Sequence, residues 1–162
     1  MRLYYSGPSP DNLRKAREHA PSHTHGAMWT PQKMTTSGLA ASTHYAIDNG
    51  AFSHTFDGEL WAATLDTALT EMPQDPDFVV LPDVPGDAAA TIEVHTHWLR
   101  DAPLPLRAGE LRRYWVIQPG VPIRVQFERM DELGAASVPP VQGVFVGGSK
   151  RWLRAHGDLI VS

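Results

Sequence analysis

Several residues that can bind or protonate a ligand stand where short apolar runs of the sequence end. They are Asp48, Asp83, Gln118, Gly147 and Gly148. Two carboxylates held close together repel each other when both are ionised, so one pKa rises and the pair offers a proton donor beside an acceptor. Such a pair of carboxylates suits the recognition of a purine.

The apolar runs before these residues have the composition of buried strands, because they are rich in β-branched and aromatic residues and end at Gly, Pro or polar residues. The runs are Tyr45–Ile47, Phe78–Leu81, Tyr114–Ile117 and Val144–Val146. The segments between them are long enough for helices, which is typical of a parallel α/β protein. Ligands of such folds bind at the carboxyl ends of the strands, so we expect the strand-end residues to face one common site.

The rest of the chain continues this alternation. Strands are expected at Leu3–Ser6, near Ala27–Trp29, and at His44–Ile47, Phe78–Leu81, Tyr114–Ile117, Val144–Val146 and Leu159–Val161. Helices are expected at Asn12–His19 with Ser9 or Asp11 as cap, at Gly58–Met72, at Asp87–Leu99 with Asp87 as cap, at about Ile123–Leu133, and at Lys150–His156. Residues 30–43 are rich in Thr, Ser, Gly and Pro, which predicts a loop.

These elements predict a single α/β domain over residues 1–162 with about six to seven mainly parallel strands. A complete eight-stranded barrel usually needs about 250 residues and seldom fewer than about 200. We therefore expect an incomplete or minimal TIM-like (β/α) barrel that lacks the C-terminal barrel strands.

Composition and charge restrict the function classes. The 162-residue chain has no cysteine, no apolar stretch long enough to span a bilayer and no signal-peptide pattern, so we expect a cytoplasmic protein with no membrane partner. The net charge of −4 argues against indiscriminate nucleic-acid binding, but residues 1–99 carry −7 and residues 100–162 carry +3. The basic residues Lys150, Arg151 and Arg154 therefore either contact a polyanion or are solvated helix ends.

The two aspartate segments also have simpler interpretations. Asn49-Gly50 between apolar runs is a strong hairpin signal and would make Asp48 a turn residue, although the weakly apolar segment 51–56 favours a strand-to-helix loop equally well. The sequence Pro-Asp-Val-Pro-Gly-Asp around Asp83 is rich in turn formers, and Asp87 can be a plain helix cap. A cap explains Asp87 but not Asp83.

Two His-x-His pairs, His23 with His25 and His95 with His97, raise a metal-binding alternative. On a strand this spacing projects both imidazoles to one side, whereas two such residues in a helix do not share a face. A metal-dependent hydrolase that uses the first pair, His23 and His25, therefore stays open as an alternative function. The leading interpretation assigns no metal site and no cofactor.

The strand-end segments, taken in order, resemble the tRNA-guanine transglycosylase superfamily, and they are most similar to its phage and prokaryotic branch that puts 7-deazaguanines into DNA. The segments are Asp48–Phe52, Leu81–Thr91, Val116–Gly120 and Val144–Ser149, and Tyr4–Gly7 with its following helix is also similar. The resemblance implies a (β/α)8 barrel that exchanges guanine for a deazapurine through a covalent nucleoside–enzyme intermediate.

The resemblance also implies roles for residues. It makes Asp48 the acid/base carboxylate, and it gives substrate contacts to Asn49, Phe52, Asp83, Gln118, Gly147 and Gly148. Of these, Asp83 would bind the Watson–Crick edge of the purine and Gln118 its carbonyl. The nucleophilic aspartate of the family lies on a later strand and is assigned to no residue here, and the family's zinc site is missing because the chain has no cysteine.

The leading expectation is thus a glycosyltransferase-like protein that binds guanine or a 7-deazapurine and takes part in base exchange in DNA or tRNA. A second subunit is one possible source of the nucleophile. The alternative is a non-catalytic base-binding or nucleic-acid-binding partner subunit.

Overall fold

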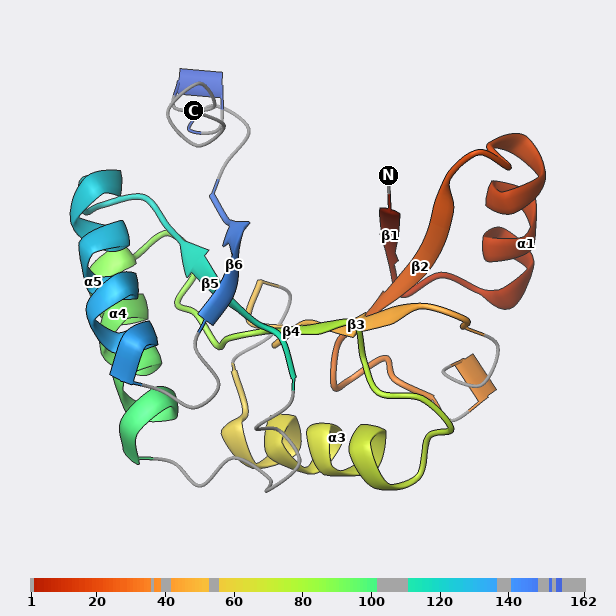
Figure 1. Cartoon of the computed structure of the whole chain (residues 1–162), viewed down its shortest axis with the longest axis horizontal. Coiled ribbons are helices and arrows are strands. Elements are labelled where there is room, and N and C mark those ends of the chain that lie inside the picture. The colour runs from red at the N-terminus through yellow and green to blue at the C-terminus, as the bar shows by residue number, and fades with distance from the viewer. Residues whose placement is uncertain are drawn as a thin grey trace.

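In a computed structural model, the described part of the chain contains six parallel strands in one sheet, and their order in the sheet is their order in the sequence (Figure 1). The strands are β1 (Arg2–Ser6), β2 (Thr24–Trp29), β3 (Tyr45–Ile47), β4 (Phe78–Val80), β5 (Arg113–Ile117) and β6 (Val141–Val146). The sheet curls into half of a barrel, which confirms the expected incomplete TIM-like α/β fold. The structure describes residues 2–35, 37–38, 42–52, 56–101, 111–136, 141–148, 152 and 154–155.

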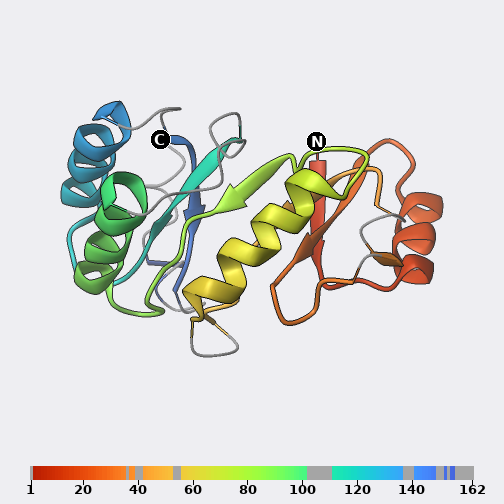
Figure 2. The ribbon, with the colours of Figure 1, turned by 90° about the horizontal axis from the view of Figure 1, so that it is seen from below.

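Four helices cover the outer face of the curled sheet. They are α1 (Pro10–His19), α3 (Gly58–Thr70), α4 (Ala88–Thr96) and α5 (Ile123–Ala136). Figure 2 shows α3 crossing the middle of the sheet, with α4 and α5 side by side at one end and α1 at the other. In the described ranges, none of the helices has the length and apolar character needed to cross a membrane.

Side-chain caps fix where three of these helices begin. The Ser9 hydroxyl accepts the backbone N–H of Asn12 at 3.2 Å, and the Asp87 carboxylate accepts that of Ala90 at 3.0 Å, so both predicted caps are confirmed. Asp57 caps α3 in the same way. Each cap contributes about 1 kcal/mol by satisfying an amide at the first turn.

Several observed elements begin or end two or more residues away from the expected positions. β2 begins at Thr24, before the expected Ala27, because it pairs along the whole length of β1. The expected helix Asp87–Leu99 stops at Thr96 and continues as the π-helical turn η1 (His97–Asp101). In addition, α3 ends at Thr70, before Met72, and β6 begins at Val141, before Val144.

Two further expectations concern the end of the chain and the hairpin. The expected strand Leu159–Val161 lies outside the described residues, as does most of the expected helix Lys150–His156, of which Trp152, Arg154 and Ala155 are described as helical. The hairpin interpretation of Asn49-Gly50 is wrong. β3 pairs in parallel with β4, and the chain runs from Gly50 toward α3 instead of returning along β3.

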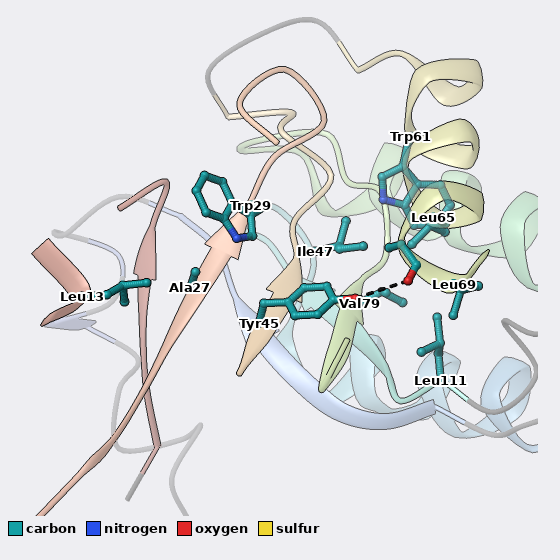
Figure 3. Packing of buried hydrophobic residues seen from close by; sticks show 11 residues of the cluster. Leu13, Ala27, Trp29, Tyr45, Ile47, Trp61, Leu65, Leu69, Val79 and Leu111 are labelled. Atoms are coloured by element: carbon teal, nitrogen blue, oxygen red, sulfur yellow. Dashed lines mark hydrogen bonds between the residues drawn. The ribbon is translucent and has the colours of Figure 1, made fainter. Parts of the chain in front are cut away.

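Alternating side chains divide the core between the two faces of the sheet. Tyr45, Ile47 and Val79 point toward the helices, where they pack with Trp61 and Leu65 of α3 (Figure 3). The intervening strand residues form a second cluster on the concave face, and its buried members are Ala46, Phe78, Val80 and Val116. Asp48 comes two residues after Ala46, and Gln118 comes two residues after Val116. Because side chains two residues apart along a strand lie on the same face, Asp48 and Gln118 are directed toward the concave side.

Candidate functional site

A polar cavity of about 260 Å³ opens at the carboxyl edge of the sheet. Each of the six strands, or the segment after it, contributes to the lining. One residue from each in turn is Ser6, Thr30, Asp48, Asp83, Gln118 and Gly147. Because all strands run in the same direction, their carboxyl ends meet at this edge, as the sequence predicted.

The cavity unites all the base-pocket residues predicted from the sequence. Asp48, Asn49, Phe52, Asp83, Gln118, Gly147 and Gly148 all line it. A larger cavity of about 810 Å³ lies beside the start of α5, but its lining is mainly apolar and includes neither aspartate. The smaller cavity is therefore the candidate site, because it holds the groups that can do chemistry.

The Asp83 carboxylate is the centre of a hydrogen-bond network in this pocket. Asn49 Nδ2 donates to its Oδ1 at 2.8 Å, and Gln118 Nε2 donates to its Oδ2 at 2.5 Å. Asn49 is 2% exposed and also donates to the carbonyl oxygen of Leu81 at 2.9 Å. Both amide protons of Asn49 are thus bound to protein acceptors, and Asn49 positions Asp83.

The orientation of the Gln118 amide follows from its partners. The backbone N–H of Gly86 donates to Gln118 Oε1 at 3.0 Å, so Nε2 must be the atom that faces Asp83. Gly86 has a φ of +83°, a conformation that glycine adopts without strain. An Nε2 group carries two protons, so Gln118 keeps one N–H to donate to a ligand.

A buried glutamine that the sequence analysis did not single out holds the Gln118 backbone. Gln126 of α5 is 1% exposed, accepts the N–H of Gln118 at 3.1 Å, and donates to the carbonyl oxygens of Gln118 and Val121, each at 2.8 Å. The only signal in the sequence is a polar residue within the apolar stripe of the predicted helix. Such residues are usually buried only when they are hydrogen-bonded.

Both aspartates of the pocket have raised pKa values. Burial raises the pKa of Asp48, and the negative charge of Asp83 raises it further, while the backbone N–H of Asn49, which donates to Asp48 Oδ1 at 2.8 Å, opposes the shift. Burial also raises the pKa of Asp83, against the hydrogen bonds from Asn49 and Gln118. The pair therefore holds a proton more readily than two exposed carboxylates would, but the main cause is burial and not the mutual repulsion that the sequence analysis expected.

Gly147, directly after β6, leaves room for the Gln118 side chain. A Cβ atom on Gly147 would overlap Gln118 Nε2, and the Gly147 N–H donates to the carbonyl oxygen of Ile117 at 2.9 Å. Gly148 has a φ of +106°, and a Cβ there would lie 3.0 Å from the Trp152 ring. Any side chain at residue 147 would displace the amide that faces Asp83.

Phe52 is 87% exposed, although it lines the pocket. Aromatic side chains are rarely left this exposed, and a ring at the mouth of a pocket can stack on a flat ligand. The basic residues predicted to meet nucleic acid are only partly described. Arg154 is helical and exposed, and Lys150 and Arg151 lie outside the described residues.

Three polar or charged residues that line the pocket were not assigned to the site by the sequence analysis. Ser6 ends β1, while Thr30 and Lys33 follow β2 in the segment that was predicted as a loop. Their common signal is that they too follow the carboxyl ends of strands.

The histidine pairs lie away from this pocket. His25 is 3% exposed at the start of β2, its Nδ1 lies 3.1 Å from the Tyr5 hydroxyl, and its Nε2 lies 2.7 Å from the carbonyl oxygen of Ala20. His95 is fully buried against the edge of Trp115, and burial lowers its pKa to about 3. Among the residues with described positions, no group of three or more His, Asp or Glu side chains is arranged to hold a metal ion.

Comparison of the chain with protein-family models, with curated proteins and with solved structures finds no match. The chemistry of the pocket and the motifs in the sequence are therefore the basis for a functional proposal.

Proposed function

We propose that this chain is a transglycosylase-like protein that binds guanine or a 7-deazapurine and takes part in base exchange in DNA or tRNA. The observation that supports this proposal is the Asp83–Gln118 pair. It presents a carboxylate acceptor beside an amide donor whose orientation is fixed by Gly86.

The pair is complementary to one edge of guanine. Guanine presents its N1–H and N2–H donors next to the O6 acceptor, and so does 7-deazaguanine. Asp83 accepts from the donors while the remaining Nε2 proton of Gln118 is donated to O6. Adenine presents an amino donor where Gln118 needs an acceptor, so it leaves buried polar groups unpaired, which costs about 1–3 kcal/mol for each group.

Asp48 has the properties of the acid/base group in such a reaction. Its pKa is raised by burial and by the charge of Asp83, so it holds a proton closer to neutral pH than an exposed aspartate does. A carboxyl group of this kind can protonate a departing purine and later accept the proton from the incoming base. Phe52 at the rim provides a ring that can stack on the bound base.

One observation favours the partner-subunit alternative. Of the described residues lining the pocket, only Asp48 and Asp83 are carboxylates, and both have roles in binding or proton transfer. The nucleophile of a complete exchange would then come from elsewhere. In this alternative the chain binds the base, and a second polypeptide completes the reaction.

The test is an exchange assay with guanine-containing DNA or tRNA and labelled guanine or 7-deazaguanine. Label that enters the polymer supports catalysis by this chain. Guanine binding without incorporation supports the partner-subunit alternative. Failure of the wild-type protein to bind guanine in preference to adenine, measured by calorimetry, would contradict the proposed pocket in both versions.

A further inference from the structure

The pocket wall formed by β1 and β2 carries a cation that the base-binding scheme does not use. Among the described residues that line the cavity, Lys33 is the sole cation, and it is exposed. The base-recognition groups, Asp83 and Gln118, follow β4 and β5 instead. Lys33 therefore requires a different explanation.

The backbone of Lys33 is held firmly at the mouth of the pocket. The carbonyl oxygen of Thr30 accepts the N–H groups of Lys33 at 3.0 Å and of Met34 at 2.9 Å, and Met34 packs against the main core cluster. The side-chain stem lies along Gly7, where an added Cβ would be 3.5 Å from Lys33 Cδ. The ammonium group thus extends from a fixed base.

The charge of Lys33 is not used to neutralise the pocket carboxylates. Among the described residues, no ion pair joins the Lys33 ammonium group to Asp48 or Asp83, and the hydrogen bonds that these carboxylates accept come from amide groups. The ammonium group is therefore available to an external anion.

A neutral purine offers no anion, whereas a nucleotide offers a phosphate next to the sugar that carries its base. The pocket holds two acidic groups, and residues 1–99 carry a net charge of −7, so an approaching nucleic acid is repelled unless a cation stands at the mouth. We propose that Lys33 binds a backbone phosphate of the nucleic-acid strand whose base occupies the pocket. The nucleic-acid strand would then cross the carboxyl end of β2. This inference rests on the proposed function.

The experiment compares three probes: free guanine, dGMP and a short single-stranded oligonucleotide with one central guanine. Lys33→Ala is the test variant. Lys15→Ala is the matched control, because Lys15 is an exposed lysine of α1 that pairs with Asp11 at 2.8 Å. Free guanine is measured by calorimetry, and the oligonucleotide by fluorescence anisotropy over a range of salt concentrations.

For Lys33→Ala we expect unchanged affinity for free guanine and weaker binding of the oligonucleotide, by about 5-fold near 0.1 M salt. The slope of log K against log salt concentration should become less steep by about 0.7, the value for one phosphate contact on a single strand. Lys15→Ala should match the wild type, and Lys33→Arg should retain most of the affinity. If the wild type binds dGMP more tightly than the oligonucleotide, and Lys33→Ala weakens dGMP binding as much as oligonucleotide binding, the ligand is a free nucleotide and the proposed path of the nucleic-acid strand is overturned.

The inference is also overturned if the wild type binds no oligonucleotide, or if Lys33→Ala and the wild type have the same salt slope. It is overturned as well if Lys33→Ala weakens the affinity for free guanine as strongly as the affinity for the oligonucleotide. A different result would show that the proposed function fails while the phosphate contact holds. The oligonucleotide would then bind in a Lys33-dependent manner, but guanine would not be preferred over adenine.

Discussion

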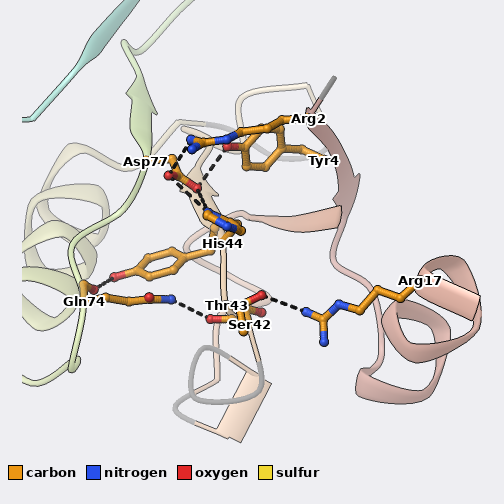
Figure 4. A network of polar contacts seen from close by, with 9 residues as sticks. Arg2, Tyr4, Arg17, Ser42, Thr43, His44, Gln74 and Asp77 are labelled. Carbon is orange, nitrogen blue, oxygen red and sulfur yellow. Dashed lines mark hydrogen bonds and ion pairs between the residues drawn. The ribbon is translucent and has the colours of Figure 1, made fainter. Parts of the chain in front are cut away.

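The two edges of the sheet each hold a largely buried aspartate, in opposite electrostatic surroundings. Directly before β4, at the amino edge, Asp77 accepts hydrogen bonds from Arg2 Nη1 and the Tyr4 hydroxyl, both at 3.0 Å, and His44 Nδ1 lies 3.2 Å away (Figure 4). At the carboxyl edge, Asp83 accepts from two neutral amides, and burial raises its pKa.

This difference separates a structural carboxylate from one prepared for a ligand. Asp77 has a cation, a hydroxyl and an imidazole around it, so its charge is compensated within the protein. Asp83 is oriented by Asn49 and Gln118 but is not neutralised, and it retains lone pairs for further donors. The contrast agrees with the general behaviour of β/α barrels, in which residues at the amino face support stability and those at the carboxyl face do chemistry.

The largest expected difference between the two edges is in base binding. Asp83→Ala should weaken guanine binding at least about 100-fold, because hydrogen bonds to a charged group contribute about 1.5–3 kcal/mol each and two are lost. Asp77→Ala should leave the affinity of the folded protein unchanged. Calorimetric titration of both variants checks this, and equal losses in the two would remove the distinction between the edges.

The reverse order is expected for stability. Asp77→Asn should lower the free energy of unfolding by about 1–3 kcal/mol, because it disturbs hydrogen bonds from Tyr4 and Arg2, although the half-exposed ion pair with Arg2 adds little. Asp83→Asn should have a smaller effect, since burial already disfavours the ionised form at this position. Urea unfolding at pH 7 measures both values. A larger loss for Asp83→Asn would contradict the structural role of Asp77.

The pH dependence of binding sharpens the comparison further. In the proposed pocket, guanine binding requires ionised Asp83, so the affinity should fall as the pH drops through the raised pKa of Asp83. Asn49→Ala removes a hydrogen bond that favours the ionised form, so the decline should begin at a higher pH than in the wild type. Asn12→Ala, at an exposed position of α1, is the control. A pH midpoint for Asn49→Ala at or below that of the wild type would contradict the assignment.

The smallest effect is expected at the Tyr4 hydroxyl. Burial and Asp77 raise the pKa of Tyr4 to about 12, so the hydroxyl stays protonated and donates to Asp77 across the working pH range. Tyr4→Phe should lower stability by about 1 kcal/mol through loss of that hydrogen bond, without a change in guanine affinity. Tyr114→Phe, at another tyrosine of the concave face, is the control in thermal unfolding. An equal effect of both substitutions would show that the bond to Asp77 contributes nothing.

The sequence by itself was enough to predict the alternating strands and helices, the caps at Ser9 and Asp87, and the shared edge for Asp48, Asp83 and Gln118. These features depend on local periodicity, on the first turn of a helix and on the common direction of parallel strands. Each of them can be recognised in a window of a few residues. The exact ends of β2 and α4 could not be predicted from such a window. The start of β2 depends on its pairing with β1, and the end of α4 depends on the π-helical turn after Thr96.

Only the tertiary structure decided how the pocket is built. The contacts of Asp83 with Asn49 and Gln118 join residues 34 and 35 positions apart, and the curl of the sheet brings Lys33 to the same cavity. The clamp of Gln126 on the Gln118 backbone likewise requires α5 to pack beside the end of β5. Register, curvature and helix packing set these distances, and no local pattern of the sequence encodes them.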